Sequence, residues 1–257
     1  MMTPADLTYI KLLRAIKSEG NIRPSRNHPA QSHFGLPVVT FDSFPLVTVR
    51  KTAWKLAIRE MEWFLSGDSQ CPSELSEWWG GQLSPGGHYI AGYGHQFRDW
   101  CMCLDQVGEL VGSIKEHQFS RRLILTAWNP ADMAIITKLN ENDKTPTTCH
   151  TTLAQFYVCD GKLSMKSYQR SADMLLGVQH NWVQSWAMLM WFAQRAGLGV
   201  GSMQWIFGDA HIYQEESHLA ALDAILSANT EVPLCQPELT IKETNNFQFS
   251  ASNFDIV

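Results

Sequence analysis

The sequence predicts an α+β domain built around one large β-sheet. A strong hairpin signal, Asp160-Gly161, separates two β-type runs, Leu153 to Cys159 and Lys162 to Tyr168. The segment Asn181 to Arg195 is apolar on nearly every side, which is typical of a helix buried at the centre of a domain. Strands and helices alternate irregularly and without repeats, so we expect a single domain over residues 1–257.

The first half of the chain has apolar residues at helical spacing in three segments. The expected helices are Asp6 to Lys17, Thr52 to Leu65 and Trp100 to His117. The expected strands are Val38 to Phe41, Leu46 to Val49 and Leu123 to Trp128. Arg121 and Arg122 adjoin the last strand, and as neighbours on a strand they would send their side chains to opposite faces.

The elements after the central helix are shorter. A glycine-rich turn (Gly197, Gly199, Gly201) is expected first. The strand Met203 to Phe207, the helix Glu215 to Ser227 and closing strands at Leu239 to Ile241 and Phe247 to Ile256 are expected to follow.

Composition narrows the class of protein. The chain has 45% hydrophobic and 18% charged residues, which are ordinary values for a globular protein. Its net charge of -5 argues against a general nucleic-acid binder, which needs a basic face. Any phosphate group is therefore expected to be held by a few local arginines.

The cysteines and the start of the chain indicate the cytoplasm. The six cysteines form no CxxC pair, so we expect free thiols and no metal site. The N-terminus lacks the pattern of a secretory signal, and no apolar run approaches the roughly 18–20 residues that span a membrane.

The stretch from Cys149 to Asn181 concentrates the chemically useful side chains. Cys149-His150 can be a nucleophile with a basic neighbour, although a buried cysteine can also simply fill space. Arg170-Ser171 can clamp a phosphate, because the guanidinium fork matches phosphate oxygens. Because the hairpin pairs the two runs, the thiol and Arg170 are expected on neighbouring strands.

Other candidates have both a structural and a functional interpretation. Glu60 lies beside aromatic residues, which would raise its pKa, but it can equally be a surface glutamate. Asn181 can cap the central helix or read the edge of a pyrimidine. Arg26 can be a solvated loop charge. Together these residues favour an enzyme with a cysteine nucleophile and a phosphorylated substrate.

Many of these residues match one known family in its own order. The matching positions are Phe44 to Thr48, Glu60, Trp63 to Leu65, Gly67-Asp68, Tyr93 to Gln96, Ser120 to Arg122, Ala127 to Asn129, Cys149-His150, Gln155 to Val158, Asp160 to Ser164, Tyr168 to Ser171, Asp173, Leu176-Gly177, Asn181 and Gly208 to Tyr213. On these residues, which span most of the chain, the sequence strongly resembles thymidylate synthase.

The resemblance implies a thymidylate-synthase-like fold, with a large mixed β-sheet, a central buried helix and flanking helices. It implies a homodimeric transferase that moves a one-carbon unit from the co-substrate 5,10-methylenetetrahydrofolate to C5 of a pyrimidine nucleotide, with no metal, membrane or DNA required. Cys149 would attack C6 of the base, and Arg170 would lower the pKa of that thiol.

The remaining site residues follow from the same resemblance. The implied phosphate-binding positions are Arg26, Arg170 and Ser171, with Arg121 and Arg122 from the other subunit. The other implied substrate-binding positions are Gln169, Asn181 at the base, and His211 and Tyr213 at the sugar. The implied folate-binding positions are Trp79, Asp173, Leu176, Gly177 and His180. Glu60 and Tyr93 would order water and move protons, and Asp173 also counts among the catalytic positions.

Asn181 bears on the choice of base. A carboxamide can accept a hydrogen bond from N3–H of uracil and donate one to O4. Cytosine presents an unprotonated N3 and a donor amine, which suit a protonated carboxylic acid, and the related phage deoxycytidylate hydroxymethylases are expected to carry Asp at this position. Asn181 therefore favours dUMP.

Four departures from the family pattern bear on the product. Synthases continue beyond Val257 with a segment that closes over the folate. The stretch between Asn129 and Cys149 is longer, and one extra residue between His150 and Gln155 predicts a β-bulge. Gln179 and His180 replace an apolar pair, which predicts a more polar wall on the folate side.

A more open and polar site favours capture of the methylene intermediate by water rather than by hydride. The sequence thus favours a deoxyuridylate hydroxymethylase that makes 5-hydroxymethyl-dUMP, close in character to the phage enzymes. The alternatives are a thymidylate synthase that makes dTMP and dihydrofolate, a dCMP hydroxymethylase, and a catalytically silent relative that binds a nucleotide or RNA.

Overall fold

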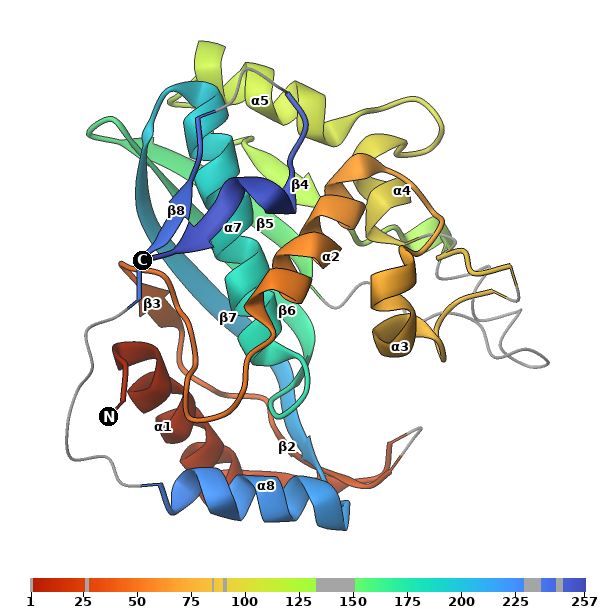
Figure 1. The fold of residues 1–257 in the computed structure, drawn as a ribbon, viewed down its shortest axis with the longest axis vertical. Helices are drawn as coiled ribbons and strands as arrows, with labels where there is room; N and C mark the ends of the chain where they lie inside the picture. The colour runs from red at the N-terminus through yellow and green to blue at the C-terminus, as the bar shows by residue number, and fades with distance from the viewer. Residues whose placement is uncertain are drawn as a thin grey trace.

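The computed structural model describes residues 2–25, 28–84, 86–89, 92–132, 151–228, 237–243 and 247–257. Within them, seven strands form one mixed sheet in the order β1-β2-β7-β6-β5-β4, with β3 also paired to β7 (Figure 1). These strands are β1 (Asn21–Arg23), β2 (Ala30–His33), β3 (Val39–Phe41), β4 (Ile124–Thr126), β5 (Thr151–Cys159), β6 (Lys162–Asp173) and β7 (Gly199–Tyr213). The pairing of β6 with β7 is parallel, and the others are antiparallel.

Helices cover one face and both ends of this sheet (Figure 1). They are α1 (Pro4–Glu19), α2 (Trp54–Ser66), η1 (Ser73–Leu75), α3 (Ser76–Trp79), α4 (Tyr93–Arg98), α5 (Gln106–Glu116), α7 (Val178–Ala196), α8 (Glu216–Leu226) and η2 (Ala251–Asn253). A small sheet of β8 (Leu239–Ile241) and β9 (Phe254–Ile256) completes the described structure. The predicted α+β architecture with a large mixed sheet is confirmed.

The hairpin of β5 and β6 forms where the sequence predicts it. Asp160 and Gly161 both have positive φ, 50° and 70°, as a two-residue turn of type I′ requires. The register shifts between Thr151, which faces Gln169, and Leu153, which faces Tyr168. The predicted β-bulge is therefore present, two residues after the Cys149 position.

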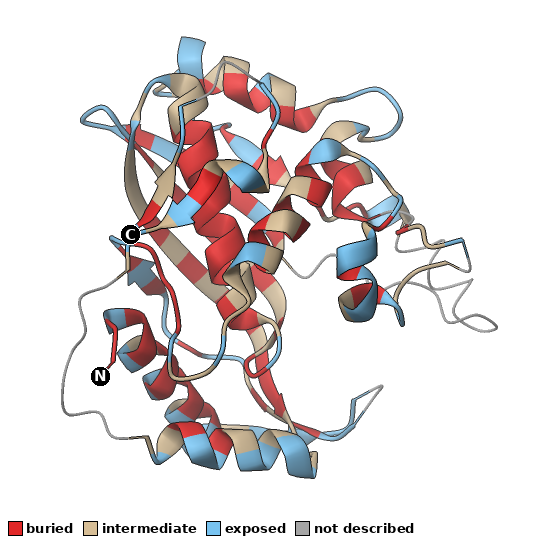
Figure 2. Ribbon diagram, viewed as in Figure 1, coloured by how far each residue is buried: buried red, intermediate tan, exposed pale blue. Residues whose placement is uncertain are grey.

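The central helix α7 is buried as predicted, and Figure 2 shows it crossing the middle of the molecule. Trp182 and Phe192 of α7 are fully buried, and Phe192 packs against Phe156 of β5 with ring centres 5.1 Å apart. Along β5, buried residues alternate with more exposed ones, so one face of the sheet is covered and the other is not. The core therefore lies between this covered face and helices α7 and α2.

The expected strand Leu46 to Val49 is wrong, and a buried carboxylate explains why. Asp6 in the first turn of α1 accepts hydrogen bonds from the backbone N–H groups of Thr48 (2.6 Å) and Val49 (3.0 Å). These amides are thus satisfied by a side chain rather than by a neighbouring strand. The contact also fixes the segment that leads to Arg50.

The helix expected from Trp100 begins six residues later, at Gln106. Cys101 and Met102 have positive φ, which breaks the helix, and Asp105 caps the new start by accepting from the N–H of Gly108 at 3.0 Å. Arg121 and Arg122 lie in an exposed turn before β4, so the strand-face argument does not apply to them.

The second half also differs from expectation in two places. Of the three glycines expected in one turn, Gly197 ends α7 with a φ of 69°, whereas Gly199 and Gly201 belong to β7. In the closing region, only Phe254–Ile256 of the expected strand from Phe247 is extended, as β9. The polar segment after α1, for which no strand is expected, contributes β1 and β2.

The described cysteines, Cys71, Cys101, Cys103 and Cys159, are free thiols. Among the helices that the structure describes, none combines the length and apolar character that a membrane span requires.

Candidate active site

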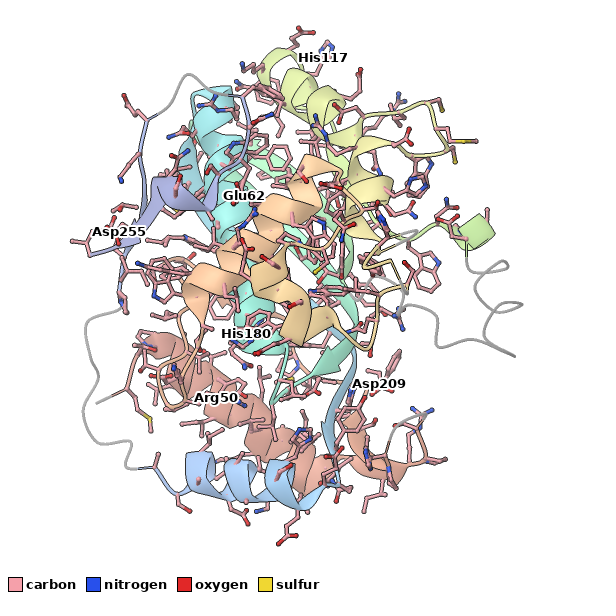
Figure 3. The ribbon with its side chains drawn as sticks, turned by 45° about the vertical axis from the view of Figure 1, so that its right-hand side comes forward. Arg50, Glu62, His117, His180, Asp209 and Asp255 are labelled. Atoms are coloured by element: carbon pink, nitrogen blue, oxygen red, sulfur yellow. The ribbon has the colours of Figure 1, made fainter. Side chains whose placement is uncertain are left out.

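A cavity of about 530 Å³ opens between α2, α7 and the ends of β6 and β7. It is lined by Arg50, Glu60, Phe64, Trp78, Trp79, Gln82, Tyr93, Gln169, Ser171, Asp173, Leu176, Gly177, His180, Asn181, His211 and Tyr213. Figure 3 shows Arg50 and His180 near one another at the lower end of α2 and α7. The cavity thus gathers most of the predicted site residues that the structure describes.

Glu60 is a buried carboxylate on the wall of this cavity. Trp79 Nε1 donates to its Oε1, and Gln184 Nε2 donates to its Oε2. Burial raises the pKa of Glu60 to about 7, and the two hydrogen bonds oppose this rise without cancelling it. The interpretation of Glu60 as a surface glutamate is therefore wrong, and the group can exchange a proton near neutral pH.

Asn181 lies inside the first turn of α7 rather than at its N-cap, because the helix begins at Val178 after Gly177. Its Oδ1 accepts from Gln169 Nε2 at 2.9 Å, and its Nδ2 donates to Gln184 Oε1 at 3.2 Å. Both Gln169 and Asn181 line the cavity. A carboxamide held at both ends therefore faces the cavity with a fixed orientation.

The turn between β6 and α7 is held by Asp173. Its Oδ1 accepts from the N–H groups of Leu175 and Leu176, both at 2.9 Å. This contact shapes the stretch from Asp173 to Gly177 that borders the cavity. The carboxylate therefore has a structural task in addition to any contact with a ligand.

His180 forms part of the wall and is tied to the backbone at both ring nitrogens. Its Nδ1 lies 2.9 Å from the carbonyl oxygen of Leu176, and its Nε2 accepts from the N–H of Ala53 at 3.3 Å. Burial lowers its pKa, which favours the neutral form of the ring. It packs on Trp78, with ring centres 4.9 Å apart.

The predicted polar wall is therefore only partly present. Gln179 is fully buried away from the cavity, and its amide donates to the carbonyl oxygens of Leu175 and Leu176. His180 reaches the cavity but uses its nitrogens within the protein. Of these two replacements, only the ring of His180 changes the cavity wall.

Tyr93 enters the cavity from the start of α4. Its ring stacks on Phe64 with centres 4.3 Å apart and an interplanar angle of 26°. Its hydroxyl accepts from the backbone N–H of Thr151 at 3.0 Å. Thr151 follows Cys149 by two residues in the sequence, so the phenol is joined to the first described residue after that position.

Three further cavity residues come from adjacent parallel strands. Ser171 of β6 is paired with Asp209 of β7. His211 and Tyr213 follow Asp209 on β7 by two and four residues. The rings of His211 and Tyr213 meet edge to face with centres 5.1 Å apart. Hydroxyl and imidazole groups thus collect at one end of the cavity.

The predicted phosphate-binding arginines are not among the cavity-lining residues. Arg170 follows Gln169 on β6 and so points to the other face of the sheet, where its guanidinium carbon lies 5.2 Å from the ring centre of Trp128. Arg121 and Arg122 are exposed. Arg26 and Cys149 lie outside the described residues, so these assignments stay predictions.

Sequence reasoning missed several side chains at the site. Arg50 lines the cavity and donates to the carbonyl oxygen of Leu175, and Phe64, Trp78 and Gln82 also line it. Gln184 does not line this cavity but forms hydrogen bonds with both Glu60 and Asn181. The only sequence signal for Gln184 was its position one turn after Asn181, on a helix expected to be buried. Among the described residues, no group of three or more His, Cys, Asp or Glu side chains could hold a metal ion.

The fold and the cavity define a class of protein, an α+β domain with an aromatic and polar ligand site that contains a carboxylate titrating near neutral pH. The sequence model of the thymidylate synthase family matches residues 7–257. The match covers nearly the whole chain, which belongs to this family and is a one-carbon transferase. The family transfers the one-carbon unit from methylenetetrahydrofolate to dUMP.

Proposed function

We propose that the protein transfers a one-carbon unit to C5 of dUMP through a covalent adduct of Cys149, and that water then completes the product as 5-hydroxymethyl-dUMP. The observation that carries the choice of dUMP is the held carboxamide of Asn181. Within the protein it uses one N–H and one lone pair, which leaves one donor and one acceptor for a base. Uracil matches that pair through O4 and N3–H.

The Cys149 thiolate adds to C6, and C5 becomes an enolate-like nucleophile that attacks the methylene carbon of the folate. Loss of the C5 proton and departure of tetrahydrofolate leave an exocyclic methylene group. Water adds to this group, and the Cys149 thiolate then leaves C6. Overall, dUMP, methylenetetrahydrofolate and water give 5-hydroxymethyl-dUMP and tetrahydrofolate.

Glu60 supports the choice of water as the last reactant. A carboxylate with a pKa of about 7 can remove a proton from water at neutral pH. It lines the same cavity as Asn181 and is connected to it through Gln184. Glu60, the proposed general base, is therefore held close to Asn181, which is proposed to recognise the pyrimidine.

The part of the cavity nearest the start of α7 suits the folate. Trp78, His180 and Leu176 give it an apolar surface on which a flat ring can stack. Asp173 and Gly177 border the same part, and Trp79 closes the side toward Glu60. We assign these positions to the folate; the resemblance implies all of them except Trp78, which its place in the cavity adds.

We assign the phosphate to Ser171, which lines the cavity, and, as the resemblance implies, to Arg26, to Arg170 and to Arg121 and Arg122 of a second copy. Arg170 packs on Trp128 in this structure, so the assignment requires its guanidinium to turn toward the phosphate. The sheet face opposite α7 supports a homodimer, because it presents partly exposed apolar side chains. Leu153 is 37% exposed and Tyr157 is 65% exposed, and both lie on this face. Covering it with another copy would bury these side chains.

Methyl transfer to give dTMP and dihydrofolate is the second candidate. The aromatic lining of the cavity favours it, because Phe64, Trp79 and Tyr93 are all buried and in contact, with Phe64 stacked on Tyr93 and edge to face with Trp79. Such a wall can exclude water while hydride moves from the folate. The two candidates share the nucleophile, the base and the co-substrate.

One incubation separates them. The protein is mixed with dUMP and methylenetetrahydrofolate, the nucleotide is analysed by mass and the folate by absorbance. A hydroxymethyl nucleotide with tetrahydrofolate supports the proposal. Production of dTMP with dihydrofolate supports the second candidate, and turnover of dCMP in preference to dUMP contradicts the role of Asn181. Nucleotide binding without turnover indicates a silent relative.

A further inference from the structure

A continuous run of hydrogen bonds joins the core to the cavity. Trp205 Nε1 donates to Gln169 Oε1 at 3.0 Å, and Gln169 Nε2 donates to Asn181 Oδ1 at 2.9 Å. Asn181 Nδ2 donates to Gln184 Oε1 at 3.2 Å, and Gln184 Nε2 donates to Glu60 Oε2. Three amide side chains thus stand in series between an indole and a carboxylate.

The two ends of this run fix the direction of every bond within it. The indole of Trp205 can only donate, and an ionised Glu60 can only accept. If the amide of Gln184 were turned over, its NH₂ group would face the NH₂ group of Asn181 and its oxygen would face the carboxylate. Each amide therefore has a single orientation that satisfies both of its neighbours.

Of the three amides in the run, Gln184 is the one that does not line the main cavity. It is 3% exposed and lies one helical turn after Asn181, so it reaches both Asn181 and Glu60 from inside the core. Asn181 is held on its oxygen side by Gln169 and on its nitrogen side by Gln184 alone. Loss of Gln184 would leave one of the two restraints on the carboxamide.

We propose that Gln184 is a positioning residue that determines base selectivity, because it holds the carboxamide of Asn181 in the orientation that matches uracil and links it to Glu60. This inference rests on the proposed function. Gln184 touches no substrate. It acts through Asn181, whose remaining donor and acceptor face the base, and through the carboxylate proposed to activate water.

Two substitutions at this position separate its two contacts. Gln184→Met removes both hydrogen bonds at similar volume and should lower the ratio of kcat/KM for dUMP to that for dCMP about tenfold. Gln184→Glu keeps an oxygen for Asn181 to donate to, so it should retain the selectivity. The carboxyl group it introduces beside Glu60 should move the acid limb of the kcat profile to higher pH.

A matched control tests whether replacing a different buried glutamine also changes the dUMP to dCMP ratio. Gln179 is a fully buried glutamine of the same helix, and its amide donates to backbone carbonyls outside the run. Gln179→Met should lower the stability but leave the dUMP to dCMP ratio unchanged. Binding of both nucleotides, followed by tryptophan fluorescence, gives a second measure of selectivity that does not depend on turnover.

The outcomes distinguish this inference from the proposed function. If wild-type protein prefers dUMP and Gln184→Met keeps that preference, the inference is wrong and the proposed function stands. If Gln179→Met changes the ratio as much as Gln184→Met does, the effect is structural and the inference is also wrong. If wild-type protein shows no preference for dUMP, both fail.

Discussion

The hydroxyl of Tyr93 accepts a hydrogen bond from the backbone N–H of Thr151, which ties the start of α4 to the start of β5. The ring that carries this hydroxyl stacks on Phe64 and lines the main cavity. Tyr93 therefore links the cavity wall to the strand that follows the Cys149 position. A structural contact and a proposed proton-transfer group coincide in one side chain.

Tyr93→Phe should keep the stack on Phe64 and remove only the hydroxyl. We expect a loss of about 0.5–1.5 kcal/mol in the free energy of unfolding, as for one buried hydrogen bond. If the phenol moves protons, kcat should fall about 100-fold or more, far beyond what this loss explains. Denaturant unfolding and steady-state kinetics measure the two effects.

Tyr9→Phe is the control for Tyr93→Phe. The hydroxyl of Tyr9 donates to the carbonyl oxygen of Met174 in the core, and the residue does not line the cavity. We expect a similar loss of stability and little change in kcat. Equal falls in kcat for the two variants would reject a chemical role for Tyr93.

Glu60 should make the stability of the protein depend on pH in a defined window. Its pKa is about 7 in the folded protein and has an ordinary value of 4.5. A carboxyl group with a raised pKa binds its proton more tightly in the folded chain, so its stabilising effect is complete below pH 4.5. That effect is lost as pH rises through 7, and its size is on the order of 3 kcal/mol.

The difference between wild type and Glu60→Gln isolates this group from the other titrating residues. We expect the free energy of unfolding of wild type to fall relative to the variant between pH 4.5 and 8, measured by urea titration. Because Glu60 must be ionised to act as the general base, the kcat of wild type should rise with pH through about 7. A difference in stability that does not change with pH would show that Glu60 titrates normally. Glu62→Gln, which removes a carboxylate of the same helix that pairs with Arg59, is the control.

Asn181→Asp should move the base preference from dUMP toward dCMP. The new carboxyl group can still accept from Gln169, but it has no N–H to donate to O4 of uracil, whereas in its protonated form its O–H can donate to N3 of cytosine. Loss of the donor for O4 of uracil should lower kcat/KM for dUMP about 10- to 100-fold relative to dCMP. Competition between the two nucleotides measures the ratio.

Asn21→Asp places the same charge change on the exposed edge strand β1 and should leave the ratio unchanged. An unaltered ratio in Asn181→Asp would mean that another group reads the base. The exchange of an amide for a carboxyl group tests hydrogen-bond pattern at constant shape, so the result bears on recognition rather than on packing.

The sequence predicted the elements whose signals are local. Asp160-Gly161 gave the hairpin because both positions need positive φ, and the broad apolar run gave α7. The sequence predicted too short a strand β7, because glycines at its start are typical of a turn. In the structure, Gly201 and Gly208 let β7 pass close to β6. A Cβ at Gly208 would lie 2.6 Å from the carbonyl oxygen of Arg170.

Residue patterns alone singled out Glu60, Asn181 and Arg170 as candidates, and the resemblance supplied most of the other site residues and their roles. Burial of Glu60 depends on Trp79 and on Gln184, which is 124 residues away in the sequence, so its raised pKa could only be suspected from nearby aromatic residues. Contacts between distant elements, such as Asp6 with Thr48, leave no periodic signal. For the same reason the link between Asn181 and Glu60 could not be foreseen.

The resemblance implies that Arg121 and Arg122 of one subunit complete the phosphate site of the other subunit. If Arg121 and Arg122 serve the other subunit, Arg122→Ala should weaken dUMP binding, and the inactive variant Cys149→Ser should still bind dUMP. Mixing the two under conditions that exchange subunits creates one site with an intact Cys149 and an intact partner arginine. Activity should therefore exceed the sum of the two separate variants, measured by product formation after mixing.

Tyr157→Glu is the control for the shared site, because Tyr157 lies on the uncovered sheet face and is 65% exposed. A carboxylate there should prevent association, since burying an unpaired charge in an interface is unfavourable. Size-exclusion chromatography with light scattering should show a monomer, and mixing this variant with Cys149→Ser should restore no activity. Restoration by the monomeric variant, or none by Arg122→Ala, would place each complete site within one chain.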